Sequence, residues 1–393
     1  MNDPIVIVSA ARTPMGAFQG ELKQFAASEL GAAAIRAAVE RAKIKPEQVD
    51  EVIMGCVLPA GQGQAPARQA SLGAGLPLAT GCTTINKMCG SGMKAAMLAH
   101  DLLAAGTNDV MVAGGMESMT NAPYLLAKAR GGYRLGHGQL IDHMFYDGLE
   151  DAYEKGRLMG SFAEDCAAKY SFTREQQDKF AVASLERAQA ANKNGSFAWE
   201  ITPMNLKAGK DERFMERDES PFKANFEKIP TLKPAFKKDG TITAANSSSI
   251  SDGGAALVMM RRSTAEKLGL APLAIVAGHS THAQEPGWFT TAPVGAIKKL
   301  YDKTGWSAGT VDLYEINEAF AVVAMAAMKE HGLPHEKVNI HGGACALGHP
   351  IGASGARILV TLIGALRKIR GKRGIASLCI GGGEATAMAL ELV

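Results

Sequence analysis

Two thiols and an imidazole are the groups in this sequence whose surroundings suggest chemistry. Cys89 lies in the segment Asn-Lys-Met-Cys-Gly-Ser-Gly at residues 86–92, between an extended stretch and the start of a long helix. The unpaired N–H groups and the dipole of a helix N-terminus stabilise an anion, so we expect a lowered pKa for this thiol. Gly90 and Gly92 lack Cβ atoms, which predicts that a substrate carbonyl can approach the backbone closely.

Three further segments place polar groups after strand-like runs. His349 precedes a helix, Cys379 ends a strand and is followed by glycines at 381–383, and Asn317 follows another strand. Imidazole is the usual base for a catalytic thiol, and glycine backbone N–H groups can bind a developing oxyanion. Because ligands of open α/β sheets bind beyond the carboxyl ends of the strands, we expect these groups to share one pocket.

The order of motifs near the N-terminus recurs near the C-terminus at a nearly constant separation. This repetition indicates two copies of one strand-helix-strand-helix-strand unit, and it predicts parallel sheets covered by helices. The matched pairs are Val49 and Val311 before strands, Ser91 and Ser354 at helix starts, and Gly114 and Gly381 after strands.

An insertion interrupts the first copy. The strand that matches residues 385–392 of the second copy is displaced to residues 252–260 in the first. The intervening chain has helix signals at 162–192 and a charged, proline-containing stretch at 207–239. We predict a cap that holds substrate over the sheets, with most of its lysines on a solvated face. The expected domains are residues 1–120 with 244–270, an inserted cap of residues 121–243, and residues 271–393.

Composition argues against several classes of protein. The 393 residues carry a formal net charge of only +3, which argues against nucleic-acid and membrane-surface proteins. No apolar run approaches the length of a membrane span, and residues 5–10 are too short for the apolar core of a signal peptide. The six cysteines lack paired spacing, so we expect reduced thiols and a cytoplasmic location. We expect no metal site, because the spacing of His341 and His349 is not that of metal ligands and no carboxylate or cysteine accompanies them.

Three motifs resemble those of the thiolase family, and the resemblance covers essentially the whole chain. They are the nucleophile loop at 86–92, Asn-Glu-Ala-Phe at 317–320 with Gly-His-Pro at 348–350, and Cys-Ile-Gly-Gly-Gly at 379–383. The resemblance implies an α/β fold of two duplicated βαβαβ units in five layers, α-β-α-β-α, with an inserted loop domain. It also implies reversible Claisen condensation of two acetyl-CoA molecules to acetoacetyl-CoA and CoA, through a ping-pong acyl-cysteine mechanism.

The same resemblance implies a role for each site residue. Cys89 is acylated, His349 activates it, and Cys379 moves a proton on the α-carbon of the second acyl-CoA. The backbone N–H groups of Cys89 and Gly381 form one oxyanion hole, and His349 with a water held by Asn317 forms the other. Acyl-CoA and CoA are substrates, with no bound cofactor. The residues implied to bind them are Leu149, Met159, Phe236, Ala244, Ser248, Phe289, Ala319 and Phe320.

Two departures from the usual thiolase pattern concern the substrate pocket. Leu158 stands where the family often has histidine, and Trp288 with Phe289 replaces a common Met-Gly. The bulk of Trp288 and Phe289 predicts a short acyl pocket that favours acetyl or acetoacetyl groups, unless they line a different opening. The resemblance also implies a homotetramer, built as a dimer of dimers, with residues 125–142 as the tetramer loop.

Four other functions compete with this interpretation. A broad-range 3-ketoacyl-CoA thiolase of fatty-acid degradation would use the same catalytic residues. A ketoacyl synthase has no need of a second thiol, and a cysteine hydrolase would have a water-directing acid-base pair in place of Cys379. A non-catalytic CoA or lipid carrier would lack at least one of the catalytic residues. The presence of Cys379 beside Cys89, Asn317 and His349 favours a thiolase.

Overall fold

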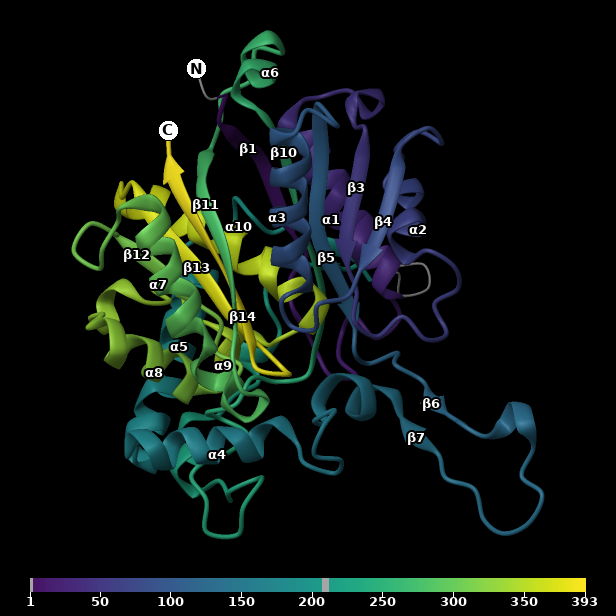
Figure 1. Ribbon diagram of the computed structural model, residues 1–393, viewed down its shortest axis with the longest axis vertical. Coiled ribbons are helices and arrows are strands. Elements are labelled where there is room, and N and C mark those ends of the chain that lie inside the picture. The colour runs from purple at the N-terminus through teal and green to yellow at the C-terminus, as the bar shows by residue number, and fades with distance from the viewer. Residues whose placement is uncertain (1–2, 207–211) are drawn as a thin grey trace.

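One long, bent sheet runs through the computed structural model, which describes residues 3–206 and 212–393 (Figure 1). Its strand order is β12-β13-β14-β11-β1-β10-β5-β3-β4, and the short β2 (Gly16–Ala17) pairs with β10. The strands are β1 (Ile5–Arg12), β3 (Glu51–Gly55), β4 (Gly81–Ile85), β5 (Val110–Ser118), β10 (Ser251–Arg261), β11 (Ala274–Ala283), β12 (Leu313–Ile316), β13 (Arg373–Ile380) and β14 (Glu384–Leu392).

The two copies of the repeated unit form two half-sheets joined at a corner. β1 and β11 pair only where Val6 and Ile7 face Ile275 and Ala274. Within the halves, β3 is parallel to β4 and β5, and β12 is parallel to β13. The expectation of wholly parallel sheets is wrong, because β14 and β10 run antiparallel to their neighbours. β14 follows β13 through a glycine turn, and so short a connection can join only antiparallel strands.

Helices and half-sheets stack in five layers, as the resemblance to thiolases implies. Helices α3 and α10 lie in the middle and contact strands of both halves (Figure 1). Helices α1 and α2 cover the outer face of the first half, and α7 and α8 cover that of the second. Their bounds are α1 (Ala27–Ala42), α2 (Pro66–Gly73), α3 (Ser91–Ala104), α6 (Arg262–Lys267), α7 (Ala292–Thr304), α8 (Ala321–His331), α9 (Ala344–Leu347) and α10 (Ile351–Ile369).

Apolar residues on both faces of each strand account for this layering. In β10, Leu257 belongs to the core around α3 and α10, whereas Val258 belongs to the core beneath α1. In β14, Met388 and Ala389 divide in the same way between the middle core and the core beneath α7. Since successive side chains of a strand point to opposite faces, each half-sheet must be covered on both sides.

The two middle helices cross where neither has a side chain. A Cβ added to Gly92 would lie 2.8 Å from the backbone nitrogen of Ala356, and one added to Gly355 would meet the backbone of Met93. Backbones can approach this closely only at glycine. These are the glycines of the repeated Ser-Gly motif, so the duplication brings the two helix starts together.

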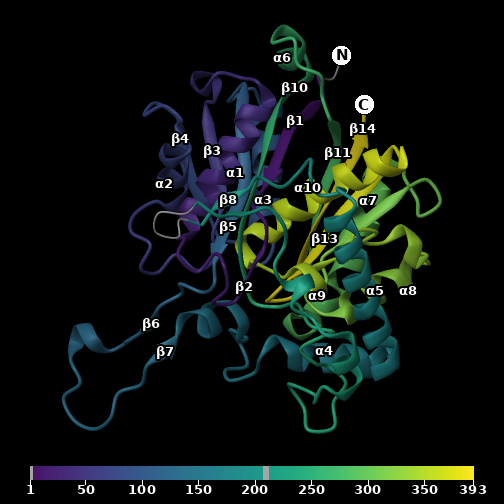
Figure 2. The same cartoon turned by 180° about the vertical axis from the view of Figure 1, so that it is seen from behind.

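The insertion lies at the end of the molecule away from the C-terminus (Figures 1 and 2). The helix expected at 162–192 is two helices, because Ser171 adopts a left-handed conformation and Thr173 caps a new helix start. Residues 207–211 of the predicted charged stretch lie outside the described residues. The elements are β6 (Tyr124–Leu125), β7 (Ile141–Asp142), α4 (Met159–Tyr170), α5 (Arg174–Lys193), β8 (Met204–Asn205) and β9 (Phe214–Met215).

A buried ion-pair group fixes the insertion to the core. The guanidinium of Arg12, in β1, lies 2.5 Å from the Glu200 carboxylate and 2.6 Å from that of Asp218, and all three side chains are fully buried. Removing one partner of such a group leaves an uncompensated charge, so these contacts hold the cap in one position. Across the described part of the chain, no helix is both long enough and apolar enough to span a bilayer.

Candidate active site

A cavity of about 350 Å³ lies where the insertion meets both halves of the core. Its walls are mostly apolar, but Cys89, His349, Cys379 and Gly381 all line it. Four of the five predicted catalytic residues are therefore brought together from three distant parts of the chain. All of the predicted substrate-binding residues line the same cavity, namely Leu149, Met159, Phe236, Ala244, Ser248, Phe289, Ala319 and Phe320.

The Cys89 loop is held in place by the first residue of α3. The Ser91 hydroxyl donates to the Met88 carbonyl at 2.6 Å and accepts from the Lys87 backbone N–H at 2.8 Å. Met88 has a φ of +47°, a conformation that costs energy for a residue with a side chain. The Ser91 contacts keep this turn closed. They hold Cys89 at the N-terminus of α3, next to the N-cap residue Gly90.

The pKa of the Cys89 thiol moves in the direction opposite to that expected from the helix start. Burial among apolar side chains raises this pKa to about 11, although the backbone N–H groups of Gly381 and of Cys89 itself favour the thiolate. Desolvation disfavours the charged form more than the helix N-terminus stabilises it. The thiol is therefore protonated at neutral pH and needs a base. The two N–H groups that act on it come from opposite halves and are those predicted to form an oxyanion hole.

His349 has one nitrogen engaged and the other free to act as that base. Ser354 donates its hydroxyl hydrogen to the Pro350 carbonyl at 3.0 Å, so its 2.6 Å contact with the imidazole requires His349 Nδ1 to be the donor. The lone pair then lies on Nε2, which is buried and has no partner within the described chain. Burial, assisted by Arg357, lowers the pKa of His349 to about 3, so the ring is neutral.

Asn317 lies behind the imidazole and is not part of the cavity wall. It follows β12, and its Nδ2 is 3.5 Å from His349 Nδ1. Its Oδ1 accepts from a guanidinium nitrogen of Arg357 at 3.3 Å. Because a guanidinium can only donate, the amide nitrogen is the end that faces the histidine; since Nδ1 also carries a hydrogen, the 3.5 Å approach is a packing contact and not a hydrogen bond. The predicted role of Asn317 in holding a water stays a prediction.

The second thiol is more deeply buried than the first. Cys379 is the penultimate residue of β13 and is 1% exposed. Burial raises its pKa well above the ordinary value, and the nearby Cys89 thiol adds to this. A thiolate with a high pKa is a strong base, which suits it to remove a proton from carbon.

Several positioning residues were missed by the sequence reasoning. Ser354 orients the imidazole and Arg357 orients Asn317. The fully buried Glu117 accepts backbone N–H bonds from residues 57 and 58 and from Gly352, so it ties the first half to the start of α10. Ser354 and Glu117 belong to the repeated motifs, which was a usable signal. For Arg357 the only signal was a charge in an otherwise apolar helical run.

Two predictions about the cavity wall are corrected. Trp288 does not line the cavity, because its ring packs against the Lys169 ammonium at 4.3 Å, whereas Phe289 and Leu158 do line it. Of the two bulky residues, only Phe289 narrows the cavity. Gly90 and Gly92 serve packing rather than substrate approach, since a Cβ at Gly90 would meet the side chain of Ile380 and one at Gly92 would meet α10.

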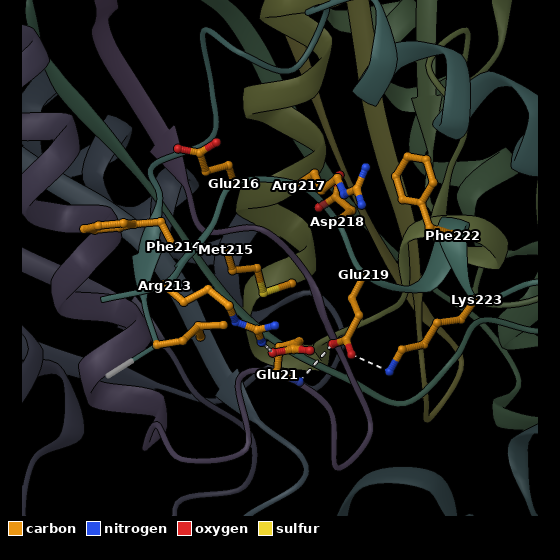
Figure 3. Close-up of a pocket in the computed structure, with 11 residues that line it drawn as sticks. Glu21, Arg213, Phe214, Met215, Glu216, Arg217, Asp218, Glu219, Phe222 and Lys223 are labelled. Carbon is orange, nitrogen blue, oxygen red and sulfur yellow. Dashed lines mark hydrogen bonds and ion pairs between the residues drawn. The ribbon is translucent and has the colours of Figure 1, made fainter. Parts of the chain in front are cut away.

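A second cavity, of about 490 Å³, lies beside β9 and offers no comparable chemistry (Figure 3). Four of its charged groups form ion pairs, Arg213 with Glu21 and Lys223 with Glu219. No cysteine or histidine stands among the described residues that line it. The reactive groups are therefore those of the first cavity.

Family comparisons agree with this arrangement. The family model of the thiolase N-terminal domain matches residues 5–263, and that of the thiolase C-terminal domain matches residues 270–392. The chain belongs to the thiolase family. The match runs through the insertion as well as through both halves of this thiolase, so it does not separate the cap as a unit of its own.

Full-length relatives give the same result. This thiolase is 53% identical to acetyl-CoA acetyltransferase 2 of Arabidopsis thaliana, over 99% of this chain and 97% of that protein. It is 49% identical to the acetyl-CoA acetyltransferase of Cupriavidus necator, over 98% and 99%. The crystal structure of the Acat5 thiolase from Ascaris suum, in complex with coenzyme A, superposes with a TM-score of 0.94 at 41% identity, covering 99% of this chain and 100% of that one.

Proposed function

We propose that this thiolase is an acetyl-CoA acetyltransferase, which condenses two acetyl-CoA molecules to acetoacetyl-CoA and CoA and also catalyses the reverse reaction. The observation that carries the proposal is the meeting of Cys89, His349 and Cys379 on one cavity. The names of the full-length relatives, which are 46% to 53% identical to this chain, support the choice of acetyl-CoA. Acyl-CoA and CoA are substrates in this proposal, and no metal or bound cofactor takes part.

The first half-reaction forms an acyl-cysteine. His349 Nε2 takes the proton of the Cys89 thiol as the sulfur attacks the thioester carbonyl. The N–H groups of Cys89 and Gly381 stabilise the negative charge that develops on the carbonyl oxygen. Collapse of the tetrahedral intermediate breaks the bond to the CoA sulfur, and the departing thiolate regains the proton from the imidazolium.

The second half-reaction forms the carbon-carbon bond. Cys379, whose thiol is protonated at rest, first gives its proton to His349 Nε2, and the resulting thiolate removes a proton from the methyl group of the second acetyl-CoA. His349, with a water held by Asn317, donates hydrogen bonds to the enolate oxygen. The enolate carbon attacks the acetyl group on Cys89, acetoacetyl-CoA is released, and the Cys89 sulfur leaves as thiolate. The Cys89 thiolate regains a proton from the His349 imidazolium, and Cys379 keeps the methyl proton, so both thiols and the imidazole return to their starting states.

An adjoining cavity of about 400 Å³ is where we propose that the CoA nucleotide binds. It shares Ala244 and Ser249 with the main cavity, which gives one continuous lining for the pantetheine arm and the nucleotide. Lys223 and Lys228 are in its wall and would face the phosphates. In this proposal CoA lies between the cap and residues 244–249.

We also propose a cytoplasmic homotetramer, assembled as a dimer of dimers. The β6–β7 ribbon projects from the body of the molecule, and its loop exposes Leu126, Leu135 and Leu140, at 49%, 98% and 69% (Figure 1). An apolar loop of this kind is explained by contact with another subunit. Light scattering of the purified protein tests the proposal, and a monomeric mass would contradict it.

Thiolysis of 3-oxoacyl-CoA substrates of increasing chain length tests the proposed function. We expect kcat/KM to be highest for acetoacetyl-CoA and to fall with each longer chain, because Phe289 narrows the cavity. Equal or higher values for longer chains would assign the protein to the broad-range 3-ketoacyl-CoA thiolases. Absence of thiolysis with every substrate would contradict both the acetyl-CoA acetyltransferase and the broad-range thiolase assignments.

A further inference from the structure

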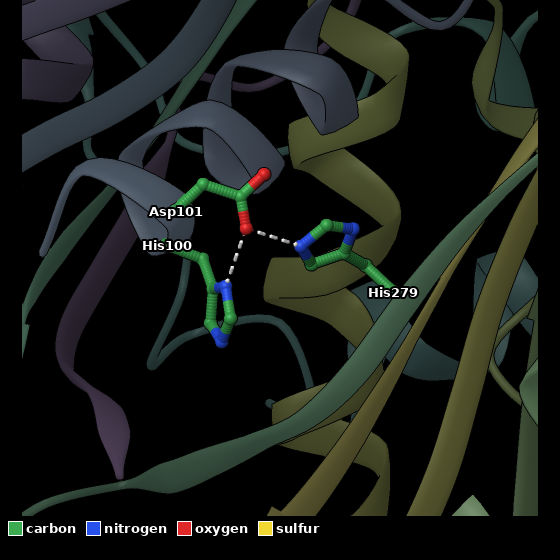
Figure 4. A group of neighbouring side chains, drawn as sticks. All are labelled: His100, Asp101 and His279. Atoms are coloured by element: carbon green, nitrogen blue, oxygen red, sulfur yellow. Dashed lines mark hydrogen bonds and ion pairs between the residues drawn. The ribbon is translucent and has the colours of Figure 1, made fainter. Parts of the chain in front are cut away.

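A cluster of two imidazoles and a carboxylate lies outside the cavity, between the two halves of the core. His100 and Asp101 are near the C-terminal end of α3, and His279 is on β11 (Figure 4). His100 Nδ1 is 3.0 Å from Asp101 Oδ1, and His279 Nε2 is 2.8 Å from the same oxygen. Figure 4 shows both rings directed toward this one carboxylate oxygen.

The geometry of the cluster is close to that of a ligand set. The Nδ1, Nε2 and carboxylate oxygen atoms all lie within 4.8 Å of one another. Ligand atoms on adjacent corners of a tetrahedral or octahedral site, with bonds of about 2.0–2.1 Å, are roughly 2.8–3.4 Å apart. The distances of 3.0 Å and 2.8 Å from the Asp101 oxygen to the two nitrogens already fall in this range, so the side chains need to shift only enough to admit the ion between them. The His100 and His279 rings stand edge to face with centroids 4.9 Å apart.

The cluster is open to solvent and mostly in the protonation state that a cation requires. The side chains of His100, Asp101 and His279 are 22%, 55% and 15% exposed, so an ion can enter and keep bound water. Burial lowers the pKa of His279, so this imidazole is neutral at pH 7. Burial alone would raise the pKa of Asp101, but the hydrogen bonds from the two histidines lower it below its usual value. A positive charge that would oppose a bound cation is that of Lys303, which donates to the His279 carbonyl at 2.9 Å.

We propose that His100, Asp101 and His279 form a binding site for a divalent transition-metal ion of the zinc, cobalt or nickel type. Two imidazoles and one carboxylate are the donors that such ions prefer, with water in the remaining positions. Besides this shift of the side chains, binding needs a change of tautomer, which moves the hydrogens to His100 Nε2 and His279 Nδ1. The ion then replaces the two hydrogen bonds to Asp101.

The bound ion links the halves and takes no part in catalysis. His100 is about 14 Å along α3 from Ser91, at about 1.5 Å per residue, so the ion cannot reach a substrate bound at Cys89. It connects the helix that carries the Cys89 loop to a strand of the second half. The expected effect is a rise in thermal stability with little change in turnover.

Cobalt titration of the chelator-treated full-length protein tests the proposal. We expect one Co²⁺ per chain, with ligand-field absorption and no thiolate charge-transfer band. His279→Ala should weaken binding more than about 100-fold, since loss of a supporting group alone costs 10–100-fold. Asp101→Asn should also weaken binding, whereas His137→Ala, at an exposed loop histidine, should not. Zinc should raise the Tm of the parent protein but not that of His279→Ala.

Three outcomes would contradict the proposed metal site. They are no binding to the parent protein, unchanged affinity in His279→Ala, or a cobalt spectrum dominated by thiolate charge transfer. Retained thiolysis in His279→Ala would establish that the variant is folded. Should that variant fail to fold, Asp101→Asn keeps the same shape and decides the question through the same titration.

Discussion

The starts of α3 and α10 are two copies of one structural unit that present opposite chemistry to the same cavity. In each, a serine of the helix bonds to the loop before it, Ser91 to the Met88 carbonyl and Ser354 to the Pro350 carbonyl. The first copy carries a thiol and the second an imidazole. Burial raises the pKa of Cys89 to about 11 and lowers that of His349 to about 3, so the same environment leaves both groups uncharged.

This difference explains how the pair can work at neutral pH. A neutral thiol beside a neutral imidazole is stable in an apolar cavity, whereas a separated ion pair would pay for desolvation. The proton therefore moves only as the sulfur attacks the thioester. In the proposed mechanism, the oxyanion hole with one N–H from each copy then stabilises the charge where it arises. Duplication thus supplied two equivalent positions, and the substitutions at them supplied an acid and a base.

Of the changes to the two helix starts, loss of the base should have the largest effect on turnover. We expect His349→Ala to lower kcat for acetoacetyl-CoA thiolysis by about 10²–10⁴-fold, the usual contribution of general base catalysis. His341→Ala is the matched control, because His341 is also buried but packs against Phe197 and does not line the cavity. A His349→Ala enzyme as active as the control would remove the imidazole from the mechanism.

The pH dependence of Cys89 alkylation should show the raised thiol pKa directly. Below a pKa of about 11, the thiolate fraction rises tenfold per pH unit, so we expect the iodoacetamide rate to climb about 1,000-fold from pH 7 to pH 10. Peptide mass spectrometry separates Cys89 from the other thiols. A plateau at pH 7–8 would mean that the free enzyme holds a thiolate-imidazolium pair instead.

The contact between the two copies is testable through stability. Gly355→Ala would bring a Cβ against the backbone of α3, so we expect the free energy of unfolding to fall by about 1–3 kcal/mol. Gly309→Ala is the control, since its nearest neighbour is 3.8 Å from the added Cβ. Equal stability in denaturant titrations of the two variants would show that α3 and α10 have room to separate.

The two helix-start serines should differ in what they control. We expect Ser354→Ala to lower kcat roughly tenfold with little change in KM, because the hydrogen bond that fixes the imidazole tautomer is worth about 1–1.5 kcal/mol. Ser91→Ala should instead disturb the loop of Cys89 and slow its alkylation. If both variants show the same change in kcat and in alkylation, the serines are purely structural.

Much of the fold and the convergence of the site could be predicted from the sequence. The repeated motifs predicted the duplicated unit, and the strand ends predicted that Cys89, His349 and Cys379 would meet. These inferences rest on local patterns and on a general property of α/β sheets, so they needed no knowledge of packing.

The errors concern quantities that depend on distant contacts. The sign of the Cys89 pKa shift is set by apolar side chains that include Leu149 and Ile351, which come from other parts of the chain. The role of Gly92 depends on α10, and the direction of the Trp288 ring depends on Lys169 of the insertion. Local sequence predicts which groups are present, but only tertiary packing decides their solvation.

The division of labour between the two thiols is the central claim, and acyl trapping tests it most directly. The enzyme is mixed with acetyl-CoA, quenched in acid and analysed by intact and peptide mass spectrometry, in parallel with an assay for acetoacetyl-CoA. The account predicts no acetylation in Cys89→Ala, and in Cys379→Ala full acetylation at Cys89 without condensation. A Cys379→Ala protein that fails to acetylate Cys89, or that still makes acetoacetyl-CoA, would contradict it.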